Sequence, residues 1–522
     1  MTIEAANPFR ADIDEISLTP RIDYARLATR NSSIRCMLFN SLGFLVFYPL
    51  AAIAFFICPK PYRWLLLLCA SYYFYSRWQL IYVGLIILST LLDFHVALAI
   101  ENEKTQFAKR SWLAASLVGN LGLLFFFKYY NFLAESLNAA QAIVSGLPQL
   151  PNSNFLLPVG ISFYTFQTLS YTFEVYLGRQ KAETRFGIFA LYVAFFPQLV
   201  AGPIERPQHL LWQLKQDFNF DYGRAVSGLQ LMLWGFFKKM VVADNLARVV
   251  DHVYDSPADF TGPAYTVATV FFAFQIFCDF SGYSDIAIGA ARLLGVDLMK
   301  NFDRPYFSKS IPEFWRRWHI SLSTWFRDYV FIPLGGSRIS PARTYFNLLV
   351  VFLASGLWHG AAWNFLVWGL LHFVFYAFGA VTASSRAALR SWAGFDRVPF
   401  LLKPLQTAAT FSLVCFGWIF FRANSMTDAG TIVRGLVSGW SEPHWIRGLV
   451  DDLILVEPFA IVVALAAIIL MEGFHLAERT HDVFTVLNRQ PLWLRWSAYY
   501  GLVWIIISFG AFDGSQFIYF QF

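Results

Sequence analysis

The sequence predicts an all-α, polytopic membrane protein, and three features of its composition and patterning support that prediction. Hydrophobic residues make up 57% of the 522 residues and charged residues only 14%, whereas a soluble domain carries about 25% charged residues. Apolar runs approach the length needed to cross a bilayer, about 20 residues, again and again along the chain. Lys and Arg gather between these runs, so the net charge of +6 reflects membrane topology rather than a nucleic-acid partner.

The apolar runs predict about eleven or twelve transmembrane or re-entrant helices. They cover residues 39–58, 64–75, 80–100, 112–133, 155–177, 186–201, 229–242, 264–294, 346–381, 410–421, 458–471 and 498–510. Several runs are short or interrupted by Pro and Gly. Irregular backbone at membrane depth is tolerated only where protein or water covers it, so we expect re-entrant segments among these runs.

Basic residues between the early runs predict the orientation of the chain. They form three groups: Lys60 and Arg63; Lys104, Lys109 and Arg110; Arg179, Lys181 and Arg185. No Lys or Arg occurs between Lys128 and Arg179. Because cytoplasmic loops carry an excess of Lys and Arg, the three groups are expected in the cytoplasm and the segment 134–154 on the opposite side.

Residues 1–36 do not fit this topology, because they carry five arginines and precede a first helix that would start outside the cytoplasm. We therefore expect them to be a polar extension that is dispensable or that results from a misassigned start, with Met37 as the true beginning. Residues 37–522 are expected to form one transmembrane domain.

The five cysteines predict neither a metal site nor a disulfide framework, because no two have CxxC spacing. We interpret them as buried thiols. No other metal or nucleotide motif is evident, and no bound cofactor is expected.

The stretch EFWRRWHISLSTWFRDYVFIPLGG (residues 313–336) combines tryptophans, a histidine and several charges. Ser310 and Glu313 have the spacing of a capping box, which predicts a helix that begins just before Phe314 and ends before Pro333. A period of 3.6 residues places His319 on the aromatic side of this helix. An interfacial amphipathic helix with a structural histidine is the alternative interpretation.

The stretch FLASGLWHGAAWNFLVWG (residues 352–369) places His359 within the long apolar run 346–381. Ionisable side chains at membrane depth are rare and usually functional, and histidine is suited to proton transfer near neutral pH. Glycines beside it would let a substrate or another backbone approach. An isolated core histidine is the alternative.

Two further polar segments interrupt apolar runs. CDFSGYSDIAIG (residues 278–289) contains Asp279, Ser281, Ser284 and Asp285, and FPQLVAGPIERPQ (residues 196–208) contains Glu205 and Arg206. Either segment can serve a site, or it can simply break a helix and cap a loop.

Together these motifs resemble the membrane-bound O-acyltransferase (MBOAT) family, and more closely its bacterial alginate O-acetyltransferase-like branch. That branch also includes transferases that D-alanylate teichoic acid and that acetylate cellulose or peptidoglycan. The motifs FGWIFFRA (residues 416–423), FIYFQF (residues 517–522) and MLFNSLGFLVF (residues 37–47) complete the resemblance. It covers residues 37–522, and the motifs occur in the family's order.

The resemblance implies a ring of helices around a central tunnel that leads to two catalytic histidines. His359 matches the family's near-invariant histidine, expected as the general base. His319 matches a second position, expected to orient the acceptor, polarise the acyl carbonyl or hold the oxyanion; histidine there favours a polysaccharide acceptor. The expected lining residues of the substrate path are Trp315, Trp318, Trp358, Asn364, Asp279, Ser281, Arg327 and Asp328.

The implied function is transfer of an acetyl or other acyl group from a cytoplasmic thioester, such as acetyl-CoA or an acyl carrier, to hydroxyls of an extracytoplasmic polysaccharide such as an alginate-like exopolymer. The expected setting is the bacterial inner membrane, with a periplasmic acetylation partner protein. The alternatives are an MBOAT enzyme acting on lipid, protein or another cell-wall polymer, a polysaccharide transporter, or a scaffold subunit of an export complex. The sequence leaves open the polymer, the donor, a direct or relayed transfer, and the oligomeric state.

Overall fold

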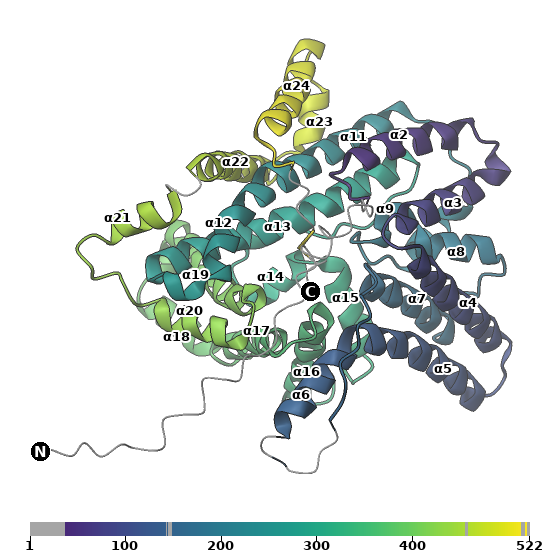
Figure 1. The fold of residues 1–522 in the computed structure, drawn as a ribbon, viewed down its shortest axis with the longest axis horizontal. Helices are drawn as coiled ribbons and strands as arrows, with labels where there is room; N and C mark the ends of the chain where they lie inside the picture. Colours follow the sequence, from purple (N-terminus) through teal and green to yellow (C-terminus); the bar gives the residue numbers. More distant parts are fainter. Residues whose placement is uncertain (1–36, 142–143, 145–148, 455–457, 513–516, 519–522) are drawn as a thin grey trace, which may run out of the picture.

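The computed structural model describes residues 37–141, 144, 149–454, 458–512 and 517–518. The extension 1–36, expected to be dispensable or misassigned, lies outside the described residues. Within them the regular secondary structure consists of helices alone, which confirms the all-α prediction (Figure 1). The protein is a multi-pass membrane protein, since many of these helices are long and apolar.

Seven helical stretches in the described part of the chain are long and apolar enough to cross a membrane. They are α4 (Leu80–Asn102), the continuous stretch of α5 and α6 (Gln106–Ala140), α13 (Gly262–Leu293), α17 (Trp363–Val381), α19 (Pro399–Arg422, the apolar part from Phe400), α22 (Pro458–Ala477) and α24 (Leu492–Phe509). Other predicted runs form shorter helices, such as the apolar α2 (Leu42–Ile57). That some of these shorter helices are re-entrant stays a prediction.

The remaining helices pack around these stretches. They are α3 (Arg63–Ser76), α7 (Ile161–Tyr176), α8 (Phe186–Ala194), α9 (Phe196–Leu199), α10 (Pro207–Leu210), α11 (Tyr222–Phe236), α12 (Asp244–Asp255), α14 (Ile311–Arg317), α15 (Ile320–Phe326), α16 (Pro341–His359), α18 (Ala383–Trp392), α20 (Met426–Gly435), α21 (Trp445–Leu449) and α23 (Val483–Asn488). In Figure 1, α14 and α15 lie near the centre, below α13 and above α16 and α17.

Helix α13 packs closely against α11, and glycines lie at the points where the two backbones meet. A Cβ on Gly228 would lie 2.6 Å from the Gly289 carbonyl oxygen, and one on Gly235 would lie 2.6 Å from that of Gly282. Small residues allow two membrane helices to bring their backbones together in this way. The polar segment 278–289 therefore does not break the helix: α13 runs unbroken through Asp279 and Ser281, which corrects the helix-break alternative for this segment. The segment 196–208 does break, between α9 and α10.

The predicted run 346–381 folds as a helical hairpin of α16 and α17. Ser340 caps α16, because its hydroxyl accepts a hydrogen bond from the Arg343 amide at 3.2 Å. The helix ends at His359, and the extended Gly360 begins the turn. A Cβ on Gly356 would lie 2.3 Å from the carbonyl oxygen of Phe365, so the two helices pack backbone to backbone beside His359.

Candidate active site

The segment 310–333 is not the single helix that the sequence predicts. The capping Ser310 is confirmed, since its hydroxyl accepts from the Glu313 amide at 3.3 Å. However, α14 ends at Arg317, Trp318 is extended, and His319 has a positive φ of 42° before α15 begins. His319 therefore occupies a break between two short helices rather than one side of a continuous helix. A π-helical turn, Arg327–Phe331, follows α15.

Asn301 holds the break around His319. Its backbone carbonyl accepts from the Ile320 amide at 2.9 Å, and its side-chain Oδ1 accepts from the Ser321 hydroxyl at 2.9 Å and the Ser321 amide at 3.3 Å. The same Oδ1 lies 3.2 Å from Nδ1 of His319. A positive φ is costly for a residue with a side chain and persists only where its surroundings enforce it. One asparagine, 18 residues earlier in the chain, enforces it here.

The Asn301 contact also fixes the tautomer of His319. Since Oδ1 already accepts from the Ser321 amide, it is an acceptor toward the imidazole as well, so Nδ1 carries the proton. In the neutral ring Nε2 is then an acceptor. Nε2 is buried and has no hydrogen-bond partner among the described residues. This geometry favours contact with a hydroxyl proton and disfavours the expected alternative in which neutral His319 holds an oxyanion.

His359 is the last residue of α16 and is buried. Its ring lies among Trp358, Trp368 and Phe421, with centroid distances of 5.0, 5.0 and 5.3 Å. Such an aromatic enclosure excludes water, which protects a thioester and strengthens local electrostatic interactions.

Trp358 connects the two histidines. Its ring centroid lies 5.8 Å from that of His319 and 5.0 Å from that of His359. Its indole Nε1 is buried without a hydrogen-bond partner among the described residues. We call His319, Trp358 and His359 the histidine–tryptophan centre. The fold thus brings together two histidines that are 40 positions apart in the chain. Beside them, Nε2 of His319 and the buried indole N–H groups of Trp358 and Trp368 have no hydrogen-bond partner among the described residues.

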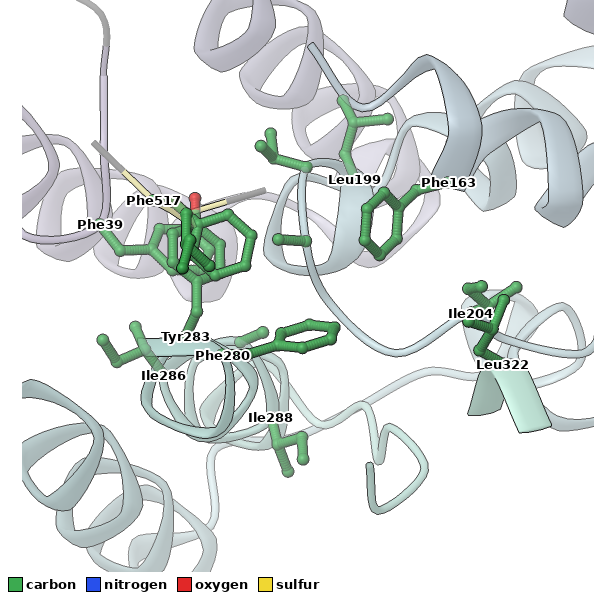
Figure 2. Packing of buried hydrophobic residues seen from close by; sticks show 14 of the residues in the cluster. Phe39, Phe163, Leu199, Ile204, Phe280, Tyr283, Ile286, Ile288, Leu322 and Phe517 are labelled. Atoms are coloured by element: carbon green, nitrogen blue, oxygen red, sulfur yellow. The ribbon is translucent and has the colours of Figure 1, made fainter. Parts of the chain in front are cut away.

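The walls of this compartment also include residues of α13, from the motif at residues 278–289, and of α7. Phe280 of α13 lies 4.6 Å from His319 by ring centroids, and Phe163 of α7 lies 5.3 Å from Trp358. Figure 2 shows the ring of Phe163 near that of Phe280, with Tyr283 and Phe517 grouped on the other side of Phe280. The rings of Phe163 and Phe280 are perpendicular, with centroids 6.5 Å apart. The described end of the C-terminal motif therefore packs one ring away from His319, since the centroids of Phe517 and Phe280 are 5.6 Å apart.

Three predicted lining residues lie near the centre without touching both histidines. Trp318 packs on Trp418 and Phe314 and is fully buried. Trp315 lies 5.0 Å from the ring of His372, a buried histidine of α17. Asn364 donates to the Ala423 carbonyl at 3.0 Å, which ties the start of α17 to the end of α19.

Asp279 and Ser281 serve a different region, the lysine–carboxylate network of Lys238, Lys239, Asp244, Asp279 and Asp285. Lys239 pairs with Asp244 and Asp279, each at 2.8 Å, and all three side chains are buried. Lys238 pairs with Asp285 at 2.6 Å and donates to the Ser281 hydroxyl at 2.9 Å. Asp279 also accepts from the Ile518 amide at 2.7 Å. The network joins α13 to the π-helical turn Phe237–Ala243 and to the end of the chain.

Arg327 and Asp328 lie in an ion-pair group at the end of α15. Arg327 pairs with Asp328 at 2.8 Å and is largely exposed, and Asp328 also pairs with Arg206 at 3.4 Å. Arg206 stacks on Tyr329 at 4.6 Å. Among the described residues, the ion pairs of Arg327 and Asp328 do not include a histidine.

The sequence did not identify Asn301 and Lys128 as residues of the site. Asn301 lies in a loop segment with no motif of its own. Lys128 donates to the carbonyls of Trp358 and His359 from within an apolar run. The signal for Lys128 was present, since a lone lysine inside a run long enough to span the membrane marks a functional position by default.

Within the described residues, no group of three or more His, Cys, Asp or Glu side chains is placed to hold a metal ion. A cavity of about 240 Å³ lies away from the histidines, between α3, α8 and the segment 213–218. Its basic residues are Lys60, Arg63, Arg185 and Lys215. Arg63 donates to the Cys58 carbonyl at 3.0 Å, and Lys215 pairs with the buried Glu183. Arg63 and Lys215 therefore already have partners within the protein.

Comparison with known proteins gives consistent matches. Residues 67–396 match the model of the MBOAT, membrane-bound O-acyltransferase, family. The chain is 41% identical over 405 residues to a probable alginate O-acetylase, AlgI, of Azotobacter vinelandii, covering 77% of this chain and 78% of that protein. It is 33% identical over 435 residues to a peptidoglycan O-acetyltransferase of Helicobacter pylori, covering 77% and 80%. A teichoic acid D-alanyltransferase of Bacillus subtilis is 27% identical over 291 residues, covering 52% and 71%.

Proposed function

Because this chain belongs to the membrane-bound O-acyltransferase family and is a membrane O-acyltransferase, we propose that it transfers an acetyl group from a thioester to hydroxyls of an extracytoplasmic polysaccharide. The observation that carries the proposal is the meeting of His319 and His359 at Trp358 in an aromatic compartment. The similarity to an alginate O-acetylase, over 77% of the chain, supports a polysaccharide acceptor.

In the proposed reaction a sugar hydroxyl oxygen attacks the thioester carbonyl carbon. A C–O bond forms, the C–S bond breaks, and the hydroxyl proton passes through an imidazole to the leaving thiolate. General-base assistance of this kind contributes about 10²- to 10⁴-fold. We assign the base to His359, and we assign to Nε2 of His319 the hydrogen bond that orients the acceptor hydroxyl.

The oxyanion of the tetrahedral intermediate needs a donor that is already in place. Trp358 supports this role, because its buried indole N–H has no partner among the described residues and its ring lies beside both histidines. In this proposal Trp358, rather than His319, stabilises the oxyanion.

Three further parts of the proposal rest on the family and on topology rather than on a contact. The donor is an acyl thioester that approaches from the cytoplasm, and the membrane is the bacterial inner membrane. A periplasmic acetylation partner is expected to receive or deliver the acetyl group. The similarity to a peptidoglycan O-acetyltransferase favours that polymer as the second candidate acceptor.

The test is the O-acetyl content of the host exopolysaccharide, measured by NMR in a deletion strain that carries wild type, His319→Ala or His359→Ala. Membrane abundance of each protein is measured in parallel. We expect wild type to restore acetylation and both variants to fail at normal abundance. Full restoration by both variants would refute the two-histidine mechanism. Unchanged exopolysaccharide but lower O-acetylation of peptidoglycan in the deletion strain would move the acceptor to the second candidate.

A further inference from the structure

Lys128 places its side-chain amine at the end of the helix that carries His359. It lies in a π-helical turn, Phe125–Tyr129, inside the long stretch of α5 and α6. Its Nζ donates to the Trp358 carbonyl at 2.7 Å and to the His359 carbonyl at 3.1 Å. These contacts cross 230 positions of sequence, so they link the first third of the chain to the active site.

The neighbouring residue completes the cap. The hydroxyl of Tyr129 donates to the Leu357 carbonyl at 3.0 Å, and the Gly360 amide donates to the Gly356 carbonyl at 3.3 Å. The last four carbonyls of a helix have no partner within the helix, and leaving them bare at membrane depth is costly. Here all four of them are satisfied, two by Lys128.

The position of the π-helical turn is informative. Such turns are rare and occur frequently at functional sites. A lysine at membrane depth is itself expensive, and a helix C-terminus is where a cation is most favourable. A neutral donor would satisfy a carbonyl as well. A single lysine amine that binds the carbonyls of both Trp358 and His359 therefore calls for a role beyond hydrogen-bond satisfaction.

We propose that Lys128 is a positioning residue for acyl transfer: by holding the carbonyls of Trp358 and His359, it fixes the backbone that aims the indole N–H and the imidazole at the reacting groups. This inference rests on the proposed function. Small displacements of a catalytic group reduce rate far more than they reduce stability. Lys128 touches neither donor nor acceptor in this proposal, so it acts only through the end of α16.

The experiment compares Lys128→Met, Lys128→Arg and Tyr129→Phe with wild type in the deletion strain, each expressed at graded levels. The measurement is the slope of polymer O-acetyl content against folded protein copies in the membrane. This slope reports transfer per molecule and does not depend on yield. Lys104→Met, an exposed lysine just before α5, is the matched control.

We expect Lys128→Met to lower the slope at least about tenfold, and Lys128→Arg, which keeps charge and donors, to stay within about threefold of wild type. Tyr129→Phe, which frees only the more distant Leu357 carbonyl, should also stay within about threefold, and Lys104→Met should match wild type. A normal slope for Lys128→Met, or equal losses in the Met and Arg variants, would overturn the proposal.

Two outcomes separate this inference from the proposed function. A Lys128→Met protein that never reaches the membrane while Lys128→Arg does would assign the lysine to folding and overturn the positioning role. Full acetylation by His359→Ala would refute the proposed mechanism itself, whatever the Lys128 variants do. An inactive His359→Ala with a normal Lys128→Met slope would reject only the positioning role.

Discussion

The lysine–carboxylate network and the histidine–tryptophan centre are both buried polar groups in an apolar protein, but they differ in how completely their atoms are used. In the network, Lys239 meets two carboxylates and Lys238 meets a carboxylate and a hydroxyl. In the centre, Nε2 of His319 and Nε1 of Trp358 have no hydrogen-bond partner among the described residues. Buried polar groups that satisfy one another stabilise a fold, whereas groups that await a partner identify a site.

This difference separates the segment 278–289 from the segments 313–336 and 352–369, which look alike in the sequence. All three combine polar and apolar residues, and all three supplied candidate site residues. In the structure Asp279 pairs with Lys239 and Ser281 accepts from Lys238, while His319 and His359 share Trp358. A lining role for Asp279 and Ser281 stays a prediction. Changes in the network should therefore reduce stability, and changes in the centre should reduce activity.

The largest effect is expected for Lys239→Met, which leaves Asp244 and Asp279 buried without their cation. Breaking a buried pair by removing one partner costs about 3–5 kcal/mol. We expect a clear fall in folded yield and in the thermal midpoint of the detergent-solubilised protein. Lys300→Met, which removes an exposed pair with Asp303, is the control and should change neither. Normal stability of Lys239→Met would contradict a structural role for the network.

Trp358→Phe should have the next largest effect, on activity rather than stability. The substitution keeps an aromatic ring between the histidines but removes the indole N–H. Loss of one oxyanion donor lowers turnover about 10²- to 10³-fold. The measurement is polymer O-acetyl content per folded copy, and the exposed Trp363→Phe is the control. Activity within about threefold of wild type would remove Trp358 from the mechanism.

Asn301→Ala should reduce activity by a smaller factor, about 10- to 100-fold, because it frees the tautomer and the orientation of His319. Ser284→Ala provides the comparison, since Ser284 only accepts from the Asn301 side chain at 3.2 Å. We expect Ser284→Ala to remain near wild type. Equal effects of the two substitutions would show that the loop packing, and not the His319 contact, is what matters.

The smallest effect is expected for the substitution His209→Gln, which removes a histidine that has a carboxylate partner. Its Nδ1 lies 2.7 Å from a carboxylate oxygen of the buried Glu205, and this hydrogen bond raises the pKa of His209 above its usual value of 6.5. The pair therefore stabilises the fold below pH 6.5 as long as Glu205, whose pKa is raised by burial, stays ionised. The contribution is lost as pH rises through the raised pKa of His209.

Thermal midpoints of wild type and His209→Gln, measured at about pH 5.5 and about pH 9, check this expectation. The difference between the two proteins should be larger at the lower pH. It should amount to no more than about 1 kcal/mol, because the ring is half exposed. His481→Gln, at an exposed position, should show no such trend. A difference that grows with pH would reverse the assigned sign.

The sequence was sufficient for the fold class, because hydropathy is a local signal. It also singled out His319 and His359, whose catalytic roles stay a prediction. It was not sufficient for the break at His319. A 3.6-residue period continues smoothly through Trp318, and the competing interaction comes from Asn301, a residue outside the segment. The sequence also did not decide whether the segment around Asp279 breaks a helix. Only the glycines of α11 that face α13, together with Lys238 and Lys239, show why α13 remains continuous.

The length of α13 sets how the enzyme responds to the lipid around it. Its 32 residues extend over about 48 Å, well beyond a hydrocarbon core of about 30 Å. A helix facing lipid would adjust its tilt to such a mismatch. Most of α13 is enclosed by protein, however, whereas α24 is enclosed hardly at all. Bilayer thickness should therefore act on α24 at the periphery, while the tilt of α13, and with it the wall that Phe280 presents to His319, is set by its protein neighbours.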